Sequence, residues 1–153
     1  MSSEPTRSDT LRHAVEQAYA VFAVYGRPAD AGFCTFCYSA DTIAYLRSTE
    51  LRAFDEEHVR RITWESADHW DSAELYKHYL PRIMDGLAPP DRCDDLFPEH
   101  FFEVLNHHRF EQWPEHERRT VVSWIEEVRR ALALRSADDA AEWGAAAAVL
   151  RPS

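Results

Sequence analysis

Residues 71–87 read DSAELYKHYLPRIMDGL and carry the clearest helical pattern of the chain. The run Asp71-Ser72-Ala73-Glu74 has capping-box spacing, in which a cap side chain and a carboxylate three residues later satisfy each other's free amides. Apolar residues then recur every three or four positions, which predicts a helix with one buried face. The residues of this face are Leu75, Tyr76, Tyr79, Leu80, Ile83, Met84 and Leu87.

Pro81 lies inside this segment, where it interrupts the helical pattern. A proline lacks the amide donor of other residues, and its ring clashes with the carbonyl four residues earlier. We therefore expect a kink at this point, or a break followed by a new helix. The pattern also predicts that Tyr79 and Leu80 are buried, whereas Lys77 and Arg82 point outward.

Helical spacing of apolar residues recurs on both sides of this segment. It predicts helices over 9–25, from Ser39 to about 46, from Asp55 onward, from Pro98 to before Pro114, from Pro114 to about 135, and after Ser136. No stretch alternates as a strand does between turn residues. We expect an all-α, single-domain, irregular bundle of about six or seven helices over residues 9–150, after a disordered N-terminus at 1–8.

Composition places the chain in a broad class of proteins. It has 153 residues, 45% of them hydrophobic, which is enough for one domain with a real core. No apolar run approaches the roughly 18–20 residues of a membrane helix, and the N-terminus lacks the apolar stretch of a secretory signal. We therefore expect a cytoplasmic protein without membrane contact. The net charge of −10 argues against direct nucleic-acid binding through a basic surface.

The acidity is concentrated in the middle of the chain, because residues 55–100 hold 12 acidic and 5 basic residues. A patch of one charge favours partners of the opposite charge. We therefore predict a partner-binding surface with Trp64 or Trp70 as its apolar anchor, since aromatic residues often dominate binding. Its acidic residues are Glu56, Glu57, Asp68, Asp71 and Glu74. The alternative is that the charge only provides solubility.

Cys34 and Cys37 form a C-x-x-C pair, a spacing that lets two sulfurs reach one metal ion. Such a pair supplies half of a tetrahedral zinc site, and Cys93 is the one further cysteine of the chain. A histidine would have to complete the site. The alternatives are that the thiols pack as small apolar groups among aromatic residues, or that they act in redox chemistry.

His100, Glu103 and His107 have spacings of three and four residues, so a helix would present them on one face. Such a face could bind a metal and support a hydrolase. However, no H-E-x-x-H motif accompanies the three residues, and apolar residues occupy the rest of the segment. A solvated stripe on an amphipathic helix is the interpretation that we prefer.

Motifs for catalysis are missing from the sequence. There is no G-x-S-x-G, no G-x-G-x-x-G and no glycine-rich phosphate loop, and the chain has only four glycines. We therefore expect a non-enzymatic protein. A further compositional feature is that Lys77 is the single lysine among 17 basic residues.

Three short motifs resemble those of an uncharacterised family of small helical proteins from actinobacteria and related bacteria. They are Cys34-x-x-Cys37-Tyr38-Ser39, Lys77-His78-Tyr79-Leu80-Pro81-Arg82 and Trp113-Pro114-x-x-Glu117-Arg118. The resemblance covers roughly residues 33–134. The family has no assigned activity, so the resemblance implies no catalytic residue. It does imply that 71–87 and 114–135 are framework helices.

These observations lead to two functional hypotheses. The first is an acidic protein-interaction module without cofactor, in the form of an inhibitor or immunity-type protein that covers a basic site on a bacterial effector such as a nuclease. The second is a zinc-binding structural or regulatory module that uses Cys34, Cys37 and Cys93.

Overall fold

The computed structural model describes residues 7–26, 37–66, 70, 72–89 and 98–150. These residues form seven α-helices and no strand, which confirms the all-α prediction. The helices are α1 (Asp9–Phe22), α2 (Ala40–Ser48), α3 (Glu56–Glu65), α4 (Ala73–Leu87), α5 (Pro98–His107), α6 (Glu115–Ala133) and α7 (Ala137–Ala147). Short 3-10 turns lie at η1 (Leu51–Ala53), η2 (Phe110–Gln112) and η3 (Ala148–Leu150).

Side-chain caps start most of these helices. Ser8, Ser39, Asp55 and Ser136 each accept a hydrogen bond from the amide three residues later. At α4 the cap is Ser72, whose hydroxyl accepts from the Leu75 amide, and Asp71 lies outside the described residues. Each of these hydrogen bonds satisfies a donor that the helix itself leaves free, which is why polar residues mark the helix starts.

The structure differs from the prediction at two prolines. Helix α4 runs through Pro81 as one element, so the helix does not break there. Pro81 and Leu80 are buried, and this packing offsets the hydrogen bond that proline cannot donate. Pro114 caps α6 in an extended conformation and is not its first helical residue. Of the two alternatives at Pro81, the break was wrong and the kink stays a prediction. The exact start of α6 was also wrong, while the helices themselves were predicted correctly.

Arg7, just before α1, is hydrogen-bonded to the end of α4. Arg7 donates to an Asp85 carboxylate oxygen at 2.6 Å and to the Asp85 carbonyl at 2.7 Å. The Tyr19 hydroxyl of α1 donates to the other Asp85 oxygen at 2.9 Å. Arg7 and Ser8 therefore belong to the described part of the chain, and the disordered N-terminus over 1–8 stays a prediction. Residues 1–6 lie outside the described part of the chain.

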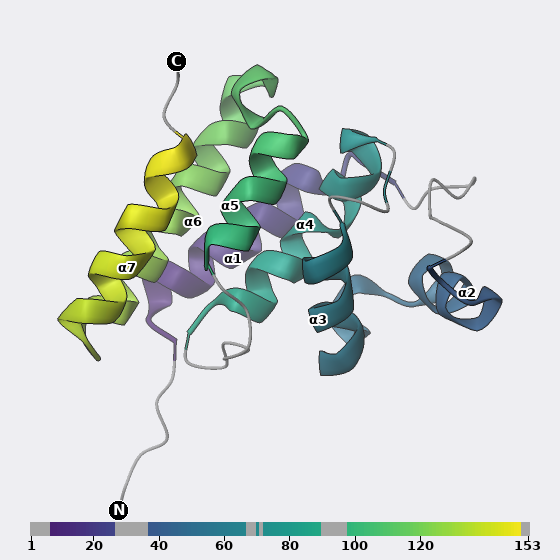
Figure 1. Cartoon of the computed structure of the whole chain (residues 1–153), viewed down its shortest axis with the longest axis horizontal. Helices are drawn as coiled ribbons and strands as arrows, with labels where there is room; N and C mark the ends of the chain where they lie inside the picture. Colours follow the sequence, from purple (N-terminus) through teal and green to yellow (C-terminus); the bar gives the residue numbers. More distant parts are fainter. Residues whose placement is uncertain (1–6, 27–36, 67–69, 71, 90–97, 151–153) are drawn as a thin grey trace, which may run out of the picture.

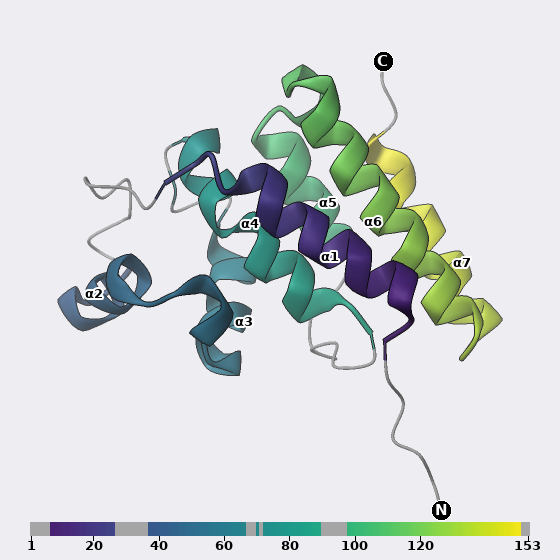
Figure 2. The ribbon, with the colours of Figure 1, turned by 180° about the vertical axis from the view of Figure 1, so that it is seen from behind.

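The central layer of the bundle is α1, with α4 on one side and α6 on the other (Figures 1 and 2). Helix α7 packs on α6 at one edge of the molecule, and α5 packs on α7 as well. Helix α3 packs on α4. Helix α2 stands apart at the far end in both views, attached through the Tyr79 hydroxyl, which donates to the Leu46 carbonyl at 2.7 Å.

Aromatic side chains join α5, α6 and α7. The Trp124 and Trp143 rings lie 5.6 Å apart, edge to face, and Phe101 and Phe102 of α5 pack against them. The Trp143 indole donates to the Ile125 carbonyl at 3.0 Å, so its polar atom is satisfied in the core. Both tryptophans are almost completely buried, as large aromatic residues in a core are expected to be.

Gly86 marks the closest approach of α3 and α4. A Cβ atom at this position would lie 2.5 Å from Cγ1 of Val59. We expect Gly86→Ala to lower the free energy of unfolding by about 1–3 kcal/mol, because the stiff valine has no room to move aside. Denaturant unfolding measures this change.

Gly144 in α7 provides the matched control, because a Cβ there meets nothing within 4 Å. Gly144→Ala should leave the protein as stable or raise the unfolding free energy by up to about 1 kcal/mol, since alanine favours helix. Equal losses in the two variants would show that helix contact at Gly86 is not the cause.

Candidate functional site

Helix α3 begins with three consecutive acidic residues. Asp55 caps the helix, because its carboxylate accepts from the backbone amide and the ring Nδ1 of His58 at 2.8 and 2.7 Å. These hydrogen bonds lower the pKa of Asp55. Glu56 and Glu57 occupy the exposed first turn, where the positive end of the helix dipole favours negative charge.

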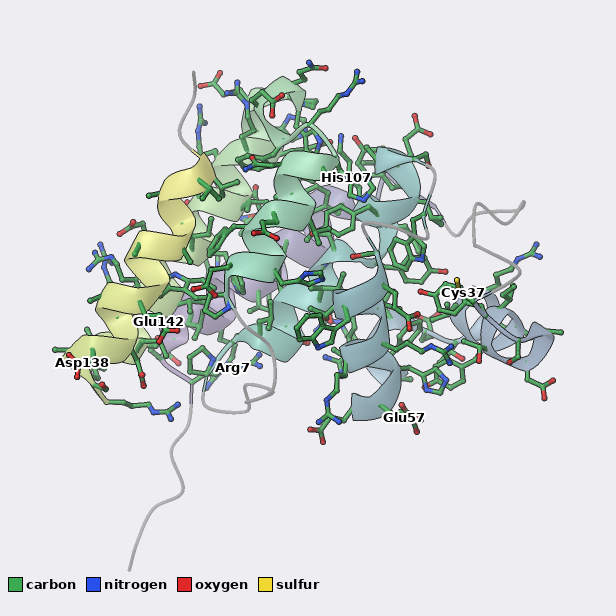
Figure 3. All side chains as sticks on the ribbon, in the orientation of Figure 1. Arg7, Cys37, Glu57, His107, Asp138 and Glu142 are labelled. Atoms are coloured by element: carbon green, nitrogen blue, oxygen red, sulfur yellow. The ribbon has the colours of Figure 1, made fainter. Side chains whose placement is uncertain are left out.

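Glu57 and Trp64 share the outward face of α3. They are seven residues apart, which is two helical turns, while Val59, Ile62 and Thr63 face inward and are buried. The Glu57 carboxylate points away from the bundle in Figure 3 and makes no ion pair with any described residue. The outward face therefore combines a solvated carboxylate with an indole.

The Trp64 indole is held in a half-buried position by α5. Its ring lies 4.6 Å from the His100 ring, and its carbonyl lies 2.8 Å from His100 Nε2. An indole fixed in this way loses little side-chain entropy when a partner covers it, which is a property of good binding anchors. The predicted anchor role of Trp64 is compatible with this position.

Two arginines lie between Glu57 and Trp64 and reduce the acidity of the face. Arg60 pairs with Glu56 at 3.3 Å, and Arg61 pairs with Glu65 at the same distance. Arg61 also donates to the Cys37 carbonyl at 3.0 Å and so ties α3 to the start of α2. Such pairs at the surface contribute little to stability, and they leave Glu57 as the carboxylate available to a partner.

The remaining predicted surface residues do not gather at this face. Trp70 is 3% exposed and packs 5.0 Å from the Tyr79 ring, so its predicted role as an exposed anchor was wrong. Glu74 is exposed but begins α4, whose other end lies beside Val59 at Gly86. About 18 Å of helix α4 separates Glu74 from Gly86. Asp68 and Asp71 lie outside the described residues.

The structure describes only part of the two groups of residues that could bind a metal according to the sequence. Cys37 is exposed, while Cys34 and Cys93 lie outside the described residues, so the zinc hypothesis stays a prediction. Within the described part of the chain, no group of three His, Cys, Asp or Glu residues could hold a metal ion. Glu103 and His107 are exposed as expected of a solvated stripe, but His100 differs because it packs on Trp64.

Lys77 is buried, so its predicted outward position was wrong. Its ammonium lies 2.7 Å from the Glu117 carboxylate of α6 and donates to the Tyr25 hydroxyl at 3.0 Å. The Tyr25 hydroxyl in turn donates to the other Glu117 oxygen at 2.5 Å. We call these three residues the buried ion cluster. It connects α4, α6 and the segment that follows α1.

Aromatic rings enclose the charge of the buried ion cluster. The Lys77 ammonium lies 4.6 Å from the Trp113 ring centre and 4.9 Å from that of Tyr25, within the range of cation–π attraction. Burial alone would lower the pKa of Lys77, but Glu117 and Tyr25 outweigh it and raise the pKa. The raised pKa favours the protonated ammonium, which is the form that pairs with the Glu117 carboxylate.

The buried ion cluster unites two of the sequence motifs. Lys77 belongs to the K-H-Y-L-P-R motif, and Trp113 and Glu117 belong to the W-P-x-x-E-R motif. Helical periodicity missed the cluster because charged residues are read as outward-facing by default. The signal that could have found it is the single lysine in a chain whose other basic residues are all arginine.

Lys77→Met and Glu117→Leu test the buried ion cluster. Each single change leaves one buried charge without its partner, and we expect a loss of about 3–5 kcal/mol in unfolding free energy. The double variant removes both charges and should recover most of this loss, measured by denaturant unfolding. Single losses below about 1 kcal/mol, or fully additive losses in the double variant, would contradict the assignment.

His108 is a buried histidine next to the cluster. Its Nε2 lies 3.0 Å from the Ser66 carbonyl, its ring stacks 4.5 Å from Tyr76, and its own carbonyl accepts from the Trp113 indole at 2.8 Å. Burial lowers the pKa of His108. The folded protein therefore favours the neutral imidazole.

This lowered pKa predicts a pH dependence of stability. The stabilisation is present above the histidine's ordinary pKa of about 6.5, and it is lost as the pH falls toward the folded-state pKa. His108→Gln should flatten the fall in unfolding free energy between about pH 7.5 and 5.5. His13→Gln on the surface of α1 is the control and should leave the slope unchanged. An unaltered slope in His108→Gln would refute the prediction.

Comparison with known proteins assigns this chain to no family. No protein-family model matches this chain, and no curated protein or solved structure matches it either. The resemblance to the actinobacterial family therefore stays a prediction. Among the described residues, no helix is long and apolar enough to cross a membrane.

Proposed function

We propose that this protein is a non-enzymatic interaction module that binds a protein with a basic surface through the outward face of α3. The observation that carries the proposal is that Glu57 and Trp64 lie on the same face of α3. The carboxylate offers long-range attraction and selectivity, and the half-buried indole offers an apolar contact. Helix α3 packs on α4 with its other side and on α5 through Trp64, so that Glu57 is exposed and Trp64 is half-buried.

The form of the module that we favour is an inhibitor or immunity-type protein. Its partner would be a bacterial effector, such as a nuclease, whose active site attracts the phosphates of a nucleic acid. Such a site is basic, and an acidic protein can cover it by imitating that charge. The net charge of −10 and its concentration in residues 55–100 support this form.

The experiment is capture of partners from the source organism at low and at moderate salt. We expect a basic protein to be retained, with retention falling as salt screens the contact. Glu57→Lys and Trp64→Ala should each weaken binding at least about tenfold. Glu103→Lys, at an exposed position of α5, is the charge-matched control and should bind as the unchanged protein does.

Three outcomes would contradict the proposal. They are retention of no basic protein, retention that is indifferent to salt, and equal effects of Glu57→Lys and Glu103→Lys. If a basic enzyme is retained, its activity should fall when the protein is added, and Glu57→Lys should restore that activity. Circular dichroism of each variant confirms that the fold persists.

A further inference from the structure

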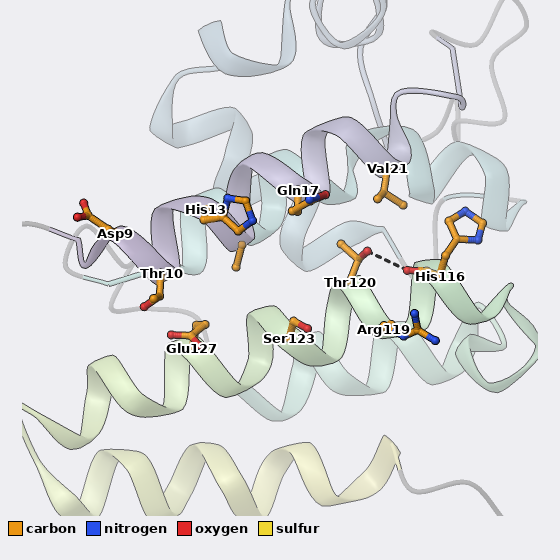
Figure 4. Close-up of a pocket in the computed structure, with 11 residues that line it drawn as sticks. Asp9, Thr10, His13, Gln17, Val21, His116, Arg119, Thr120, Ser123 and Glu127 are labelled. Carbon is orange, nitrogen blue, oxygen red and sulfur yellow. Dashed lines mark hydrogen bonds between the residues drawn. The ribbon is translucent and has the colours of Figure 1, made fainter.

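A hollow of about 440 Å³ lies where the start of α1, the end of α6 and the end of α4 come together. Part of its lining is apolar, because Leu11 is completely buried, Ala131 is partly buried, and Pro89 forms a wall. The hollow shares Thr10 and Glu127 with a longer groove of about 620 Å³ between α1 and α6. Figure 4 shows these two residues at one end of that groove.

The hollow is basic, although the net charge of the whole chain is −10. Three of the described residues that line it are arginines, namely Arg7, Arg130 and Arg135. Glu127 is the one acidic residue among them. The groove beside it has the opposite sign, since its described lining includes Asp9 and Glu127 against Arg119. The hollow therefore attracts an anion locally, and it disfavours a cation.

The three arginines differ in how far their charge is already neutralised. Arg7 donates to an Asp85 carboxylate oxygen at 2.6 Å and to carbonyls at the end of α4, so its guanidinium is a fixed part of the wall. Arg130 pairs with Glu127 at 2.8 Å within α6, and such a surface pair contributes little. Arg135 makes no ion pair with any residue that the structure describes. Its charge is therefore available to a ligand.

Leu134 lines the same hollow and is 88% exposed. In the described part of the chain it is the most exposed of the large hydrophobic residues. It directly follows α6 and precedes Arg135. A leucine that faces water gains free energy when an apolar group covers it. The hollow thus presents an apolar surface and an unpaired guanidinium side by side.

We propose that this hollow binds a small carboxylic acid with an apolar body, such as a medium-chain fatty acid. Its carboxylate would lie on Arg135, with Arg130 as a second donor, because a planar guanidinium matches the two oxygens of a carboxylate. One unpaired arginine matches one negative charge, which favours a carboxylate over a doubly charged phosphate. The apolar body would cover Leu134. A volume of about 440 Å³ lies in the range of small-molecule sites, and a flat lipid surface cannot enter a concave site.

The charges also determine the orientation of the ligand. Asp9 and Glu127 lie at the end of the groove that adjoins the hollow, and they repel a carboxylate (Figure 4). The carboxylate therefore stays at Arg135, and a longer apolar body extends toward the groove. Short side chains line the centre of the groove and leave room for that body, namely Ala14, Thr120 and Ser123.

Octanoate tests the proposal, with acetate and octylammonium as matched ligands, and isothermal titration calorimetry of the full chain measures binding. Acetate lacks the apolar body, and octylammonium has the same body with the opposite charge. We expect octanoate to bind with a dissociation constant of about 1 mM or below, and the other two to bind at least about tenfold more weakly. Equal binding of octanoate and octylammonium would overturn the proposal.

Two variants locate the site. Arg135→Glu should raise the dissociation constant for octanoate at least about tenfold, and Leu134→Ser should raise it at least about threefold. Both residues are exposed, and circular dichroism confirms that the fold persists. Arg109→Glu is the charge-matched control, because Arg109 is exposed but precedes α6, whereas the hollow lies at its other end. Val149→Ser is the control for Leu134→Ser, because Val149 is 51% exposed and lies in η3. Both controls should bind octanoate as the unchanged protein does.

Three further results would overturn the proposal. They are an absence of octanoate binding up to about 10 mM, octanoate binding that Arg135→Glu leaves unchanged, and inorganic phosphate that binds as tightly as octanoate. The last result would show a site for anions without an apolar body. Glu57→Lys should leave octanoate binding unchanged, so the ligand site and the proposed function of α3 fail or succeed separately.

Discussion

The buried contact between the Lys77 ammonium and the Glu117 carboxylate holds the centre of the bundle in register. Together with the Tyr25 hydroxyl it connects α4, α6 and the end of α1 at one point, 2.7 Å between the charged atoms. A charge in a protein interior is costly without its partner, so the three segments must meet in this one arrangement to satisfy it. The apolar stripes on these helices provide the driving force for packing, and the ion cluster selects among the ways in which they could pack.

The compact Lys77 ammonium suits this position because Tyr25 and Trp113 surround it. A guanidinium is planar and broader, and it needs more hydrogen-bond acceptors than one carboxylate and one hydroxyl provide. This difference is a physical reason for a lysine at this position in a chain whose other basic residues are all arginine. The same centre positions the framework on which α3 rests, since α3 packs against the far end of α4.

The surfaces of the protein depend less on this centre. Helix α2 stands away from the bundle, and α3 exposes Glu57 and Trp64 on its outer side. The groove between α1 and α6 lies elsewhere, with its own apolar and charged residues. The molecule thus has an aromatic and ionic core, and the α1–α6 groove and the outward face of α3 lie on different helices.

The helices were predictable from the sequence because their signals are local. Ser39, Asp55 and Ser136 cap the helices they were expected to cap, and the apolar residues of 71–87 are all buried. Capping and periodicity act within one or two turns, so a linear pattern contains them. The continuity of α4 through Pro81 was not predictable, because burial against other helices outweighs the local cost of proline.

The candidate sites, unlike the helices, were decided mainly by the tertiary structure. The sequence by itself determined the helical class, several of the helix starts and the excess of acidic residues in the middle of the chain. Only the tertiary structure decided that Lys77 turns inward, that Trp70 is covered while Trp64 is half-buried, and that Glu57 and Glu74 lie far apart. Charge and aromatic character are properties of single residues, but burial and proximity depend on which helices pack together, and that depends on contacts between residues distant in the chain.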